Sequence, residues 1–475
     1  MVFSSLLFLY IFLPICIGAY YLVRSLRAKN AVLIAASLVF YAWGEPVYVL
    51  LLVFSAAMNY GFGLLMEKYR HSKLRKLFFV LCVVLDILFL VFFKYVGLLT
   101  DSANQTLGLS LPVPDVRLPI GISFYTFQIL SYVVDTYRDK VAVQRSFPNF
   151  LLYVSLFPQL IAGPIVRYTD IAAQLADRSF ASDHVFYGAF RFCCGLGKKI
   201  LLANYAGKAA SLLLDGSAAA STTVGTWLGM LLFAFEIYYD FSGYSDMAIG
   251  LGRIFGFKFN YHENFNLPYT AHSITDFWRR WHISLGSFFR DYVYIPLGGN
   301  RKHQILNLLI VWSLTGLWHG ASWNFLLWGL YFFVLLVIEK SLRKILDKIP
   351  KWIRIAFTFI LVLFGWSLFY FTDFTRLTQM LGVMFGKGTF SSQTVAVSAL
   401  NNLFLLLVSV IGCTPLPRML GLFLSEYSAA GENEISLKKQ KMYAIGVFVF
   451  DIAVLFLCTV SLMGSSYNPF LYFRF

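Results

Sequence analysis

Long apolar stretches alternate with short polar or basic linkers along the whole chain. A membrane-spanning helix needs roughly 20 predominantly apolar residues, and many of these stretches approach or reach that length. The stretches expected to form membrane helices are 3–23, 31–43, 46–66, 77–93, 119–135, 185–203, 224–251, 352–371, 397–413 and 442–463. The pattern predicts an all-α, polytopic membrane protein with about ten to twelve spans. No domain boundary is evident, so we expect a single domain over residues 1–475.

Basic clusters set the expected orientation. Cytoplasmic loops of membrane proteins carry an excess of Lys and Arg. The runs EKYRHSKLRK at 67–76 and SLKKQK at 436–441 therefore mark the cytoplasmic side. The stretch 3–23 is long and follows no basic region, so it is expected to be a retained span rather than a cleaved signal peptide. Counting spans between the clusters places both the N-terminus and the C-terminal tail, residues 464–475, outside the cell.

Two stretches do not fit a straight span. The segment FPQLIAGP within 150–166 holds two prolines and a glycine, which predict a bent or re-entrant helix. Residues 304–338 form one apolar stretch with basic residues at both ends. If both ends are cytoplasmic, the chain must enter, turn near the WHG sequence around His319, and leave. Gly316 and Gly320 are expected to permit that turn because glycine tolerates unusual backbone angles.

Residues 263–303 mix arginines with many aromatic side chains, which favours a helix at the cytoplasmic membrane interface. On one continuous helix, His282 would lie on one face, with Arg280 and Ser287 on another. The residues expected to share the face of His282 are Thr275, Trp278, Leu285 and Phe289.

The composition agrees with a membrane protein and excludes a soluble one. The chain is 59% hydrophobic and 13% charged, whereas soluble domains average about 25% charged residues. The net charge of +15 comes from clusters between apolar stretches, which indicates the positive-inside rule rather than nucleic-acid binding. The six cysteines have no metal-ligand spacing, so we expect reduced thiols and no metal site.

Four ionisable residues within apolar stretches are candidates for chemistry. His319 is either a histidine that hydrogen-bonds a neighbouring helix or a general base, since imidazole titrates near neutral pH and suits acyl transfer to a hydroxyl. His282 is either a second functional histidine or an anchor for its helix. Asp240 and Asp246 lie in YYDFSGYSDMAIG, either as structural partners of nearby Tyr and Ser hydroxyls or along a path; we favour the structural role.

The run DFWRRWHISLGSFFRDYVYIPLGGNR, followed by GLWHGASWNFLLWGLY, resembles the signature of the membrane-bound O-acyltransferase (MBOAT) family. The bacterial branch that includes the alginate O-acetyltransferase membrane subunit is the most similar. FLPICIGAYYLV, FYAWGEP, FPQLIAGPIVRY, YYDFSGYSDMAIG and PFLYFRF extend the resemblance over nearly the whole chain. It implies a helical bundle around a central tunnel. His319 matches the essential histidine of the family, and His282 matches its second polar position.

The resemblance also implies a reaction and its partners. Acetyl-CoA is the expected cytoplasmic donor, with no bound cofactor. The acetyl group would leave outside for an exported or cell-surface polysaccharide, through an extracytoplasmic SGNH-type esterase or transferase. Arg279, Arg280 and Lys302 either meet the donor phosphates or only obey the positive-inside rule. Alternatives are D-alanyl transfer to teichoic acid, peptidoglycan O-acetylation, and a transporter of polysaccharide or lipid carrier without chemistry. The expected location is the plasma membrane of a bacterium.

The C-terminal sequence NPFLYFRF allows two interpretations. Tyr and Phe gather at membrane interfaces, so the tail is either an aromatic anchor or a functional segment. Asn468-Pro469 would turn the chain after the last span. The resemblance includes an aromatic, tyrosine-bearing terminus, which implies that Tyr472 accepts the acyl group near His319 and passes it to the partner. Arg474 would orient the terminal carboxylate or dock that partner.

Overall fold

The structure, a computed structural model, describes residues 1–475 except 179–181, 217–220, 260–262, 421–433, 465–470 and 472–475. In the first half, the helices (η marks a 3-10 or π-helix) are η1 (Phe8–Phe12), α1 (Leu13–Leu22), α2 (Leu26–Ala42), α3 (Tyr48–Lys68), α4 (Leu74–Leu107), α5 (Ile122–Tyr137), α6 (Phe147–Ser155), α7 (Phe157–Leu160), α8 (Tyr168–Ala176), α9 (Ser182–Gly197), η2 (Lys198–Ala203), α10 (Asn204–Leu214) and α11 (Thr223–Ile254). The later helices are η4 (Pro268–Thr270), α12 (Ile274–Arg280), α13 (Ile283–Phe289), η5 (Arg290–Tyr294), α14 (Gln304–His319), α15 (Trp323–Leu346), α16 (Lys351–Tyr370), α17 (Phe374–Met384), α18 (Gln393–Asn401), α19 (Leu403–Gly412) and α21 (Glu434–Met463). The predicted all-α class is confirmed.

Among the described residues, five helices are long and apolar enough to cross a membrane: α3, α4, α15, α16 and α21. The stretch 397–413, predicted as one span, lies in the pair α18 and α19, which bends by 55° and would make a sixth. The predicted span 224–251 lies in the long helix α11, which is not among the five. The predicted spans 3–23, 31–43, 119–135 and 185–203 form shorter or broken helices, and the count of ten to twelve spans stays a prediction.

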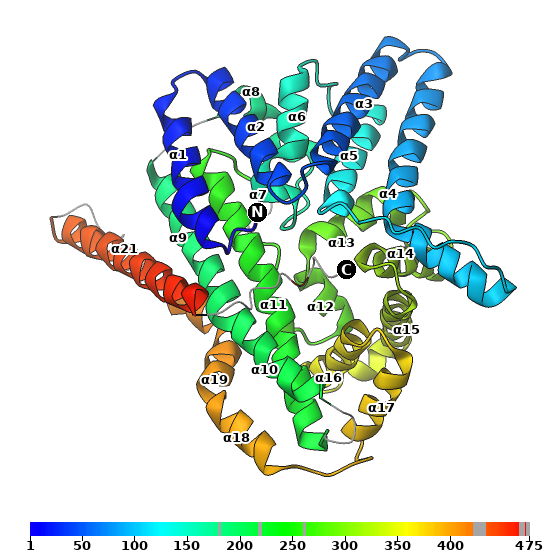
Figure 1. Cartoon of the computed structure of the whole chain (residues 1–475), viewed down its shortest axis with the longest axis vertical. Coiled ribbons are helices and arrows are strands. Elements are labelled where there is room, and N and C mark those ends of the chain that lie inside the picture. The colour runs from blue at the N-terminus through cyan, green and yellow to red at the C-terminus, as the bar shows by residue number, and fades with distance from the viewer. Residues whose placement is uncertain (179–181, 217–220, 260–262, 421–433, 465–470, 472–475) are drawn as a thin grey trace.

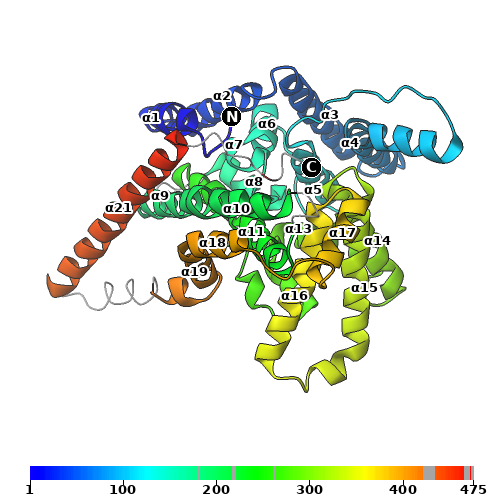
Figure 2. The same cartoon turned by 60° about the horizontal axis from the view of Figure 1, so that its bottom comes forward.

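Helix α11 forms the centre of the bundle. It runs through the middle of the molecule in both views, with α9 and α10 beside it, whereas α21 lies at the edge (Figures 1 and 2). Two glycine pairs bring α9 and α11 together: a Cβ on Gly195 would lie 2.5 Å from the Gly243 carbonyl oxygen, and one on Gly188 would lie 2.7 Å from that of Gly250. Small residues that allow close backbone approach are a common way to pack membrane helices.

The bent segment around FPQLIAGP is confirmed. Helix α6 ends at Ser155, the short α7 follows, and Gly163 has a φ of 107°. Neighbouring side chains receive the polar groups that the break releases: the Phe157 N–H donates to the Ser37 hydroxyl at 3.1 Å, and the Gln159 amide donates to the Tyr153 carbonyl at 2.6 Å. Broken backbone at membrane depth is tolerated where protein supplies such partners.

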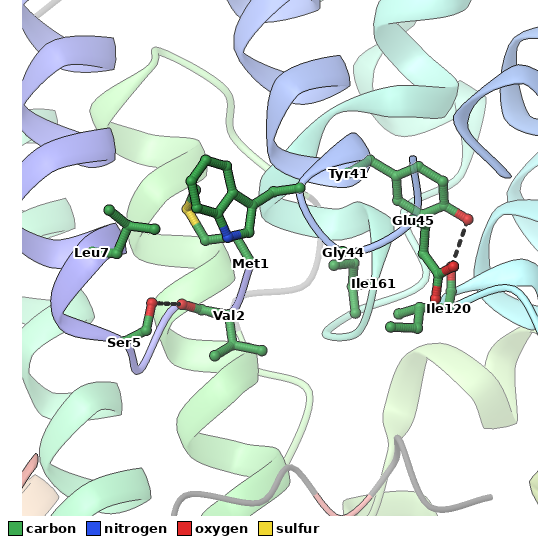
Figure 3. A pocket seen from close by; sticks show the side chains of 10 residues that line it. Met1, Val2, Ser5, Leu7, Tyr41, Gly44, Glu45, Ile120 and Ile161 are labelled. Atoms are coloured by element: carbon green, nitrogen blue, oxygen red, sulfur yellow. Dashed lines mark hydrogen bonds between the residues drawn. The ribbon is translucent and has the colours of Figure 1, made fainter. Parts of the chain in front are cut away.

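The FYAWGEP segment joins α2 to α3 and lines a cavity of about 300 Å³ beside the start of the chain (Figure 3). The Tyr41 hydroxyl donates to the Ile120 carbonyl at 2.9 Å. The carboxylate of Glu45 is buried and lies 3.5 Å from the Arg117 guanidinium. These contacts hold the α2–α3 connection against the segment that precedes α5, which gives the motif a structural role.

Candidate active site

His319 is the last residue of α14, at a sharp turn into α15. The predicted hairpin at the WHG sequence is confirmed, but the expected reason for its glycines is wrong. Gly320 has an extended backbone with a φ of −172°, and Gly316 lies within the helix. The glycines are needed for space instead: a Cβ on Gly316 would lie 2.3 Å from the Phe325 carbonyl oxygen, and one on Gly320 would lie 2.2 Å from the Phe325 ring.

Aromatic rings surround the His319 imidazole. The side chain is 5% exposed. Its ring centroid lies 4.8 Å from that of Trp328, 5.0 Å from that of Trp318 and 5.3 Å from that of Phe369. These rings come from α14, α15 and α16, so the hairpin and the next helix together fix the orientation of the imidazole.

Two residues of α4, which the sequence reasoning missed, bind the end of α14. The Lys94 ammonium donates to the Trp318 carbonyl at 2.5 Å, and the Tyr95 hydroxyl donates to the Leu317 carbonyl at 2.5 Å. The last carbonyls of a helix lack partners within it, and a cation at that end is favourable. Lys94 is a buried lysine in the apolar run VFFKYVG, and this exception to the pattern could have revealed it.

His282 also lies at a turn, but its backbone is strained. The prediction of one continuous helix is wrong, because α12 ends at Arg280 and α13 begins at Ile283. His282 therefore does not share one helical face with the residues named for that helix. Its φ of 45° lies in the left-handed region, which costs a non-glycine residue roughly 1–2 kcal/mol. The side chain is 2% exposed, so the turn holds the imidazole inside the bundle.

A polar network decides which nitrogen of His282 carries the proton. The Ser284 hydroxyl donates to Asn264 Oδ1 at 3.0 Å and accepts from the Ile165 N–H at 3.0 Å. Since the Ser284 proton is directed to Asn264, we assign the His282 tautomer in which Nδ1, 3.3 Å from Ser284 Oγ, is the donor. His282 Nε2 then carries the lone pair, and it has no hydrogen-bond partner among the residues that the structure describes.

The two histidines meet at one tryptophan. The Trp318 ring centroid lies 5.8 Å from that of His282 and 5.0 Å from that of His319. The Phe241 ring of α11 packs on His282 from another side at 4.6 Å. The structure thus brings together the two histidines singled out in the sequence, within one buried aromatic environment.

The three basic candidates for donor binding lie in different surroundings. Arg279 and Lys302 are exposed. Lys302 precedes α14, so a helix of 16 residues, about 24 Å long, separates it from His319. The Arg280 guanidinium is engaged with Asp276 at 2.9 Å. Burial raises the pKa of the Asp276 carboxyl, but the hydrogen bonds from Arg280 and from the His272 N–H, together with the nearby positive charge, outweigh this effect and the pKa is lowered overall.

The two aspartates of YYDFSGYSDMAIG have basic partners, not the hydroxyl partners that we expected. Asp246 contacts Lys198 at 2.7 Å and Arg191 at 2.9 Å. Asp240 contacts Lys199 at 2.6 Å. These partners lie in α9 and in the π-helical turn η2, about 40 to 55 residues earlier in the chain, so the local sequence pattern did not indicate them.

A cavity of about 500 Å³ lies next to the His319 turn. Gly320, Ala321 and Ser322, which follow His319, form part of its wall, as does Leu471 from the C-terminal tail. Glu236 of α11 also lines it. Tyr472 and Arg474 lie outside the described residues, so the expectations for them remain predictions.

Comparison with known proteins shows the family. The profile of MBOAT, the membrane-bound O-acyltransferase family, matches residues 36–378. The chain is 37% identical to the probable alginate O-acetylase AlgI of Azotobacter vinelandii over 100% of both chains. It is 40% identical to the protein of that name from Pseudomonas aeruginosa, over 82% of this chain and 76% of the relative. A peptidoglycan O-acetyltransferase of Helicobacter pylori is 33% identical over 81% of this chain and 80% of the relative. This multi-pass membrane protein therefore belongs to the membrane-bound O-acyltransferase family.

Proposed function

We propose that this protein transfers an acetyl group from cytoplasmic acetyl-CoA across the bacterial plasma membrane, for O-acetylation of an exported or cell-surface polysaccharide. The observation that carries the proposal is the pair of buried histidines around Trp318, with His319 on the turn of the α14–α15 hairpin. The full-length similarity to probable alginate O-acetylases supports a polysaccharide as the final acceptor. The basic loops support an orientation with both termini outside.

In the proposed reaction, His319 acts as the general base. It takes the proton from an attacking hydroxyl while the oxygen of that hydroxyl adds to the thioester carbonyl. The C–S bond then breaks, and the imidazolium returns the proton to the departing sulfur, which leaves as the thiol of coenzyme A. His282 contributes Nε2 as a second acceptor in the same site. Arg279, Arg280 and Lys302 would hold the donor phosphates at the cytoplasmic side.

The attacking hydroxyl in this proposal belongs to Tyr472. A phenol has a pKa near 10, so an imidazole can assist its deprotonation, and the resulting phenyl ester is a reactive donor. An extracytoplasmic SGNH-type transferase would then take the acetyl group onto its own hydroxyl, returning a proton to the tyrosine, and deliver it to the polysaccharide. The tail residue that precedes Tyr472 lines the cavity beside the His319 turn, which supports a tail that lies close to the site.

The first experiment compares donors. Purified protein in nanodiscs would receive either acetyl-CoA or an alanyl-carrier protein, and release of the free thiol would be measured. We expect thiol release with acetyl-CoA and not with the alanyl-carrier, and release with the alanyl-carrier only would refute acetyl transfer. In cells, Tyr472→Phe keeps the ring but removes the nucleophile, so we expect polysaccharide acetylation to be lost. A normal acetylation level in that variant would exclude the tyrosine relay.

Peptidoglycan O-acetylation is a second candidate, favoured by the 33% identity to the Helicobacter pylori protein. Both candidates use the same donor and the same histidines, so only the acceptor separates them. Mass spectrometry of peptidoglycan fragments and of the secreted polysaccharide from one deletion strain distinguishes the two. We expect acetyl groups to disappear from the polysaccharide and to remain on the peptidoglycan.

A further inference from the structure

Asp240 binds the C-terminal tail directly. It lies in the middle of α11 and is 2% exposed. One carboxylate oxygen contacts the Lys199 ammonium at 2.6 Å, and the other accepts the backbone N–H of Leu471 at 2.8 Å. Leu471 is 231 residues away in sequence and is 3% exposed. A buried carboxylate of the central helix therefore holds the backbone N–H of Leu471, a contact that does not involve the side chain at that position.

The neighbouring ion pair shows why this contact matters. Asp246 lies less than two turns further along α11, and its two oxygens are satisfied by cations, Lys198 and Arg191. Asp240 has a cation on one oxygen and the tail on the other. Charged groups at membrane depth are costly and usually serve a function. The Asp246 cluster joins α11 to α9 and η2, whereas the Asp240 pair leaves one oxygen for the tail.

The anchored residue lies beside the turn that carries His319. Leu471 lines the 500 Å³ cavity together with Gly320, the residue that follows His319. Glu236, one turn before Asp240 on α11, lines the same cavity. The anchored residue and the residue that follows His319 are thus on the walls of one cavity.

We propose that Asp240, held in place by Lys199, is a positioning residue that anchors the C-terminal tail at the cavity beside His319. This inference rests on the proposed function only in that the tail is taken to carry an acceptor tyrosine. The binding of the tail can be tested without measuring acyl transfer. A carboxylate accepts a charge-assisted hydrogen bond from the N–H, which is stronger than a bond between neutral groups.

The test measures how accessible the tail is. Leu471→Cys places a thiol at the anchored residue, and its reaction with a membrane-impermeant maleimide is followed in nanodiscs. The six native cysteines are free, so protein without Leu471→Cys supplies the background. Two double variants keep the site neutral overall: Asp240→Leu/Lys199→Met removes the acceptor oxygen, and Asp240→Asn/Lys199→Met keeps one. We expect labelling of Leu471→Cys to become on the order of tenfold faster with Asp240→Leu/Lys199→Met. With Asp240→Asn/Lys199→Met it should stay near the rate of Leu471→Cys alone.

A second pair of variants leaves the ion pair intact, in case the double variants do not fold. Leu471→Pro removes the donor N–H, and Leu471→Ala retains it. With Phe473→Cys as the thiol probe in both, we expect faster labelling in the proline variant. Equal rates in both members of either pair would overturn the anchor, whatever acyl transfer does. If the Asp240→Leu/Lys199→Met and Leu471→Pro variants are labelled faster but acetylate polysaccharide normally, the anchor stands and the tail has no role in acyl transfer.

Discussion

The two histidine turns reach the same buried site by different physical means. His319 ends a regular helix, and glycines with ordinary backbone angles let its hairpin close tightly. His282 has left-handed backbone between two short helices, and a network through Ser284 and Asn264 holds it. The first turn depends on helix packing and the second on polar side chains. We therefore expect substitutions at the two turns to affect different measurable properties.

The largest effect is expected at His319 itself. His319→Gln keeps a hydrogen-bonding side chain of similar reach but removes the base, so acyl transfer should fall by about 10²–10⁴-fold. Thiol release from acetyl-CoA by purified protein measures the rate, and the size-exclusion profile shows whether the variant is folded. Transfer at the normal rate by a folded variant would leave His319 a structural histidine and would assign the base to another residue.

The two turns also differ in how far the sequence predicts them. The WHG hairpin followed from an apolar stretch with basic residues at both ends, because that pattern is local. The break before His282 could not be predicted, since it depends on Asn264, whose side chain accepts from the Ser284 N–H at 3.1 Å and whose carbonyl accepts from the Ile283 N–H at 2.9 Å. A local pattern in DFWRRWHISLGSFF favours one helix, and tertiary contacts override it.

The charged residues show the same limit of local sequence patterns. The basic partners of Asp240 and Asp246 lie in helices that are distant in sequence, so no spacing rule connects them. Lys94 interrupts an apolar run and was detectable as an exception, but its target, the Trp318 carbonyl, was not. The sequence indicates where membrane segments end and which polar residues interrupt them. The partners of those polar residues depend on how the helices pack.

The next effect concerns packing at the His319 turn. Gly316→Ala would place a Cβ 2.3 Å from a backbone oxygen of α15, which cannot move without the helix. Overpacking of this kind costs about 1–3 kcal/mol, so the midpoint of thermal unfolding in detergent should fall clearly. Gly61→Ala in α3 is the matched control, since nothing lies within 4 Å of its Cβ. An unchanged midpoint in Gly316→Ala would show that α14 and α15 do not depend on this close approach.

A smaller effect is expected at the network of the His282 turn. Ser284→Ala removes the acceptor for His282 Nδ1–H, so the proton is no longer held on that nitrogen and Nε2 loses its assigned lone pair. We expect kcat to fall about tenfold, the equivalent of one hydrogen bond, with little change in KM for acetyl-CoA. Ser287→Ala is the control on the same helix, since its hydroxyl donates to the Ser284 carbonyl. If both serine variants lose activity equally, the effect comes from the helix and not from the proton on His282.

The smallest effect compares the backbones of the two turns, without their imidazoles. At position 282, the left-handed φ of 45° favours glycine, so His282→Gly should be more stable than His282→Ala by about 1 kcal/mol. At position 319, the residue is helical, so His319→Ala should be more stable than His319→Gly by up to about 1 kcal/mol. Both members of each pair lack the ring, which cancels the loss of aromatic contacts. Thermal unfolding of the four variants should therefore give differences of opposite sign at the two turns. A preference for alanine at both positions would mean that position 282 does not keep its left-handed backbone when the ring is absent, and that the imidazole itself helps to hold the turn.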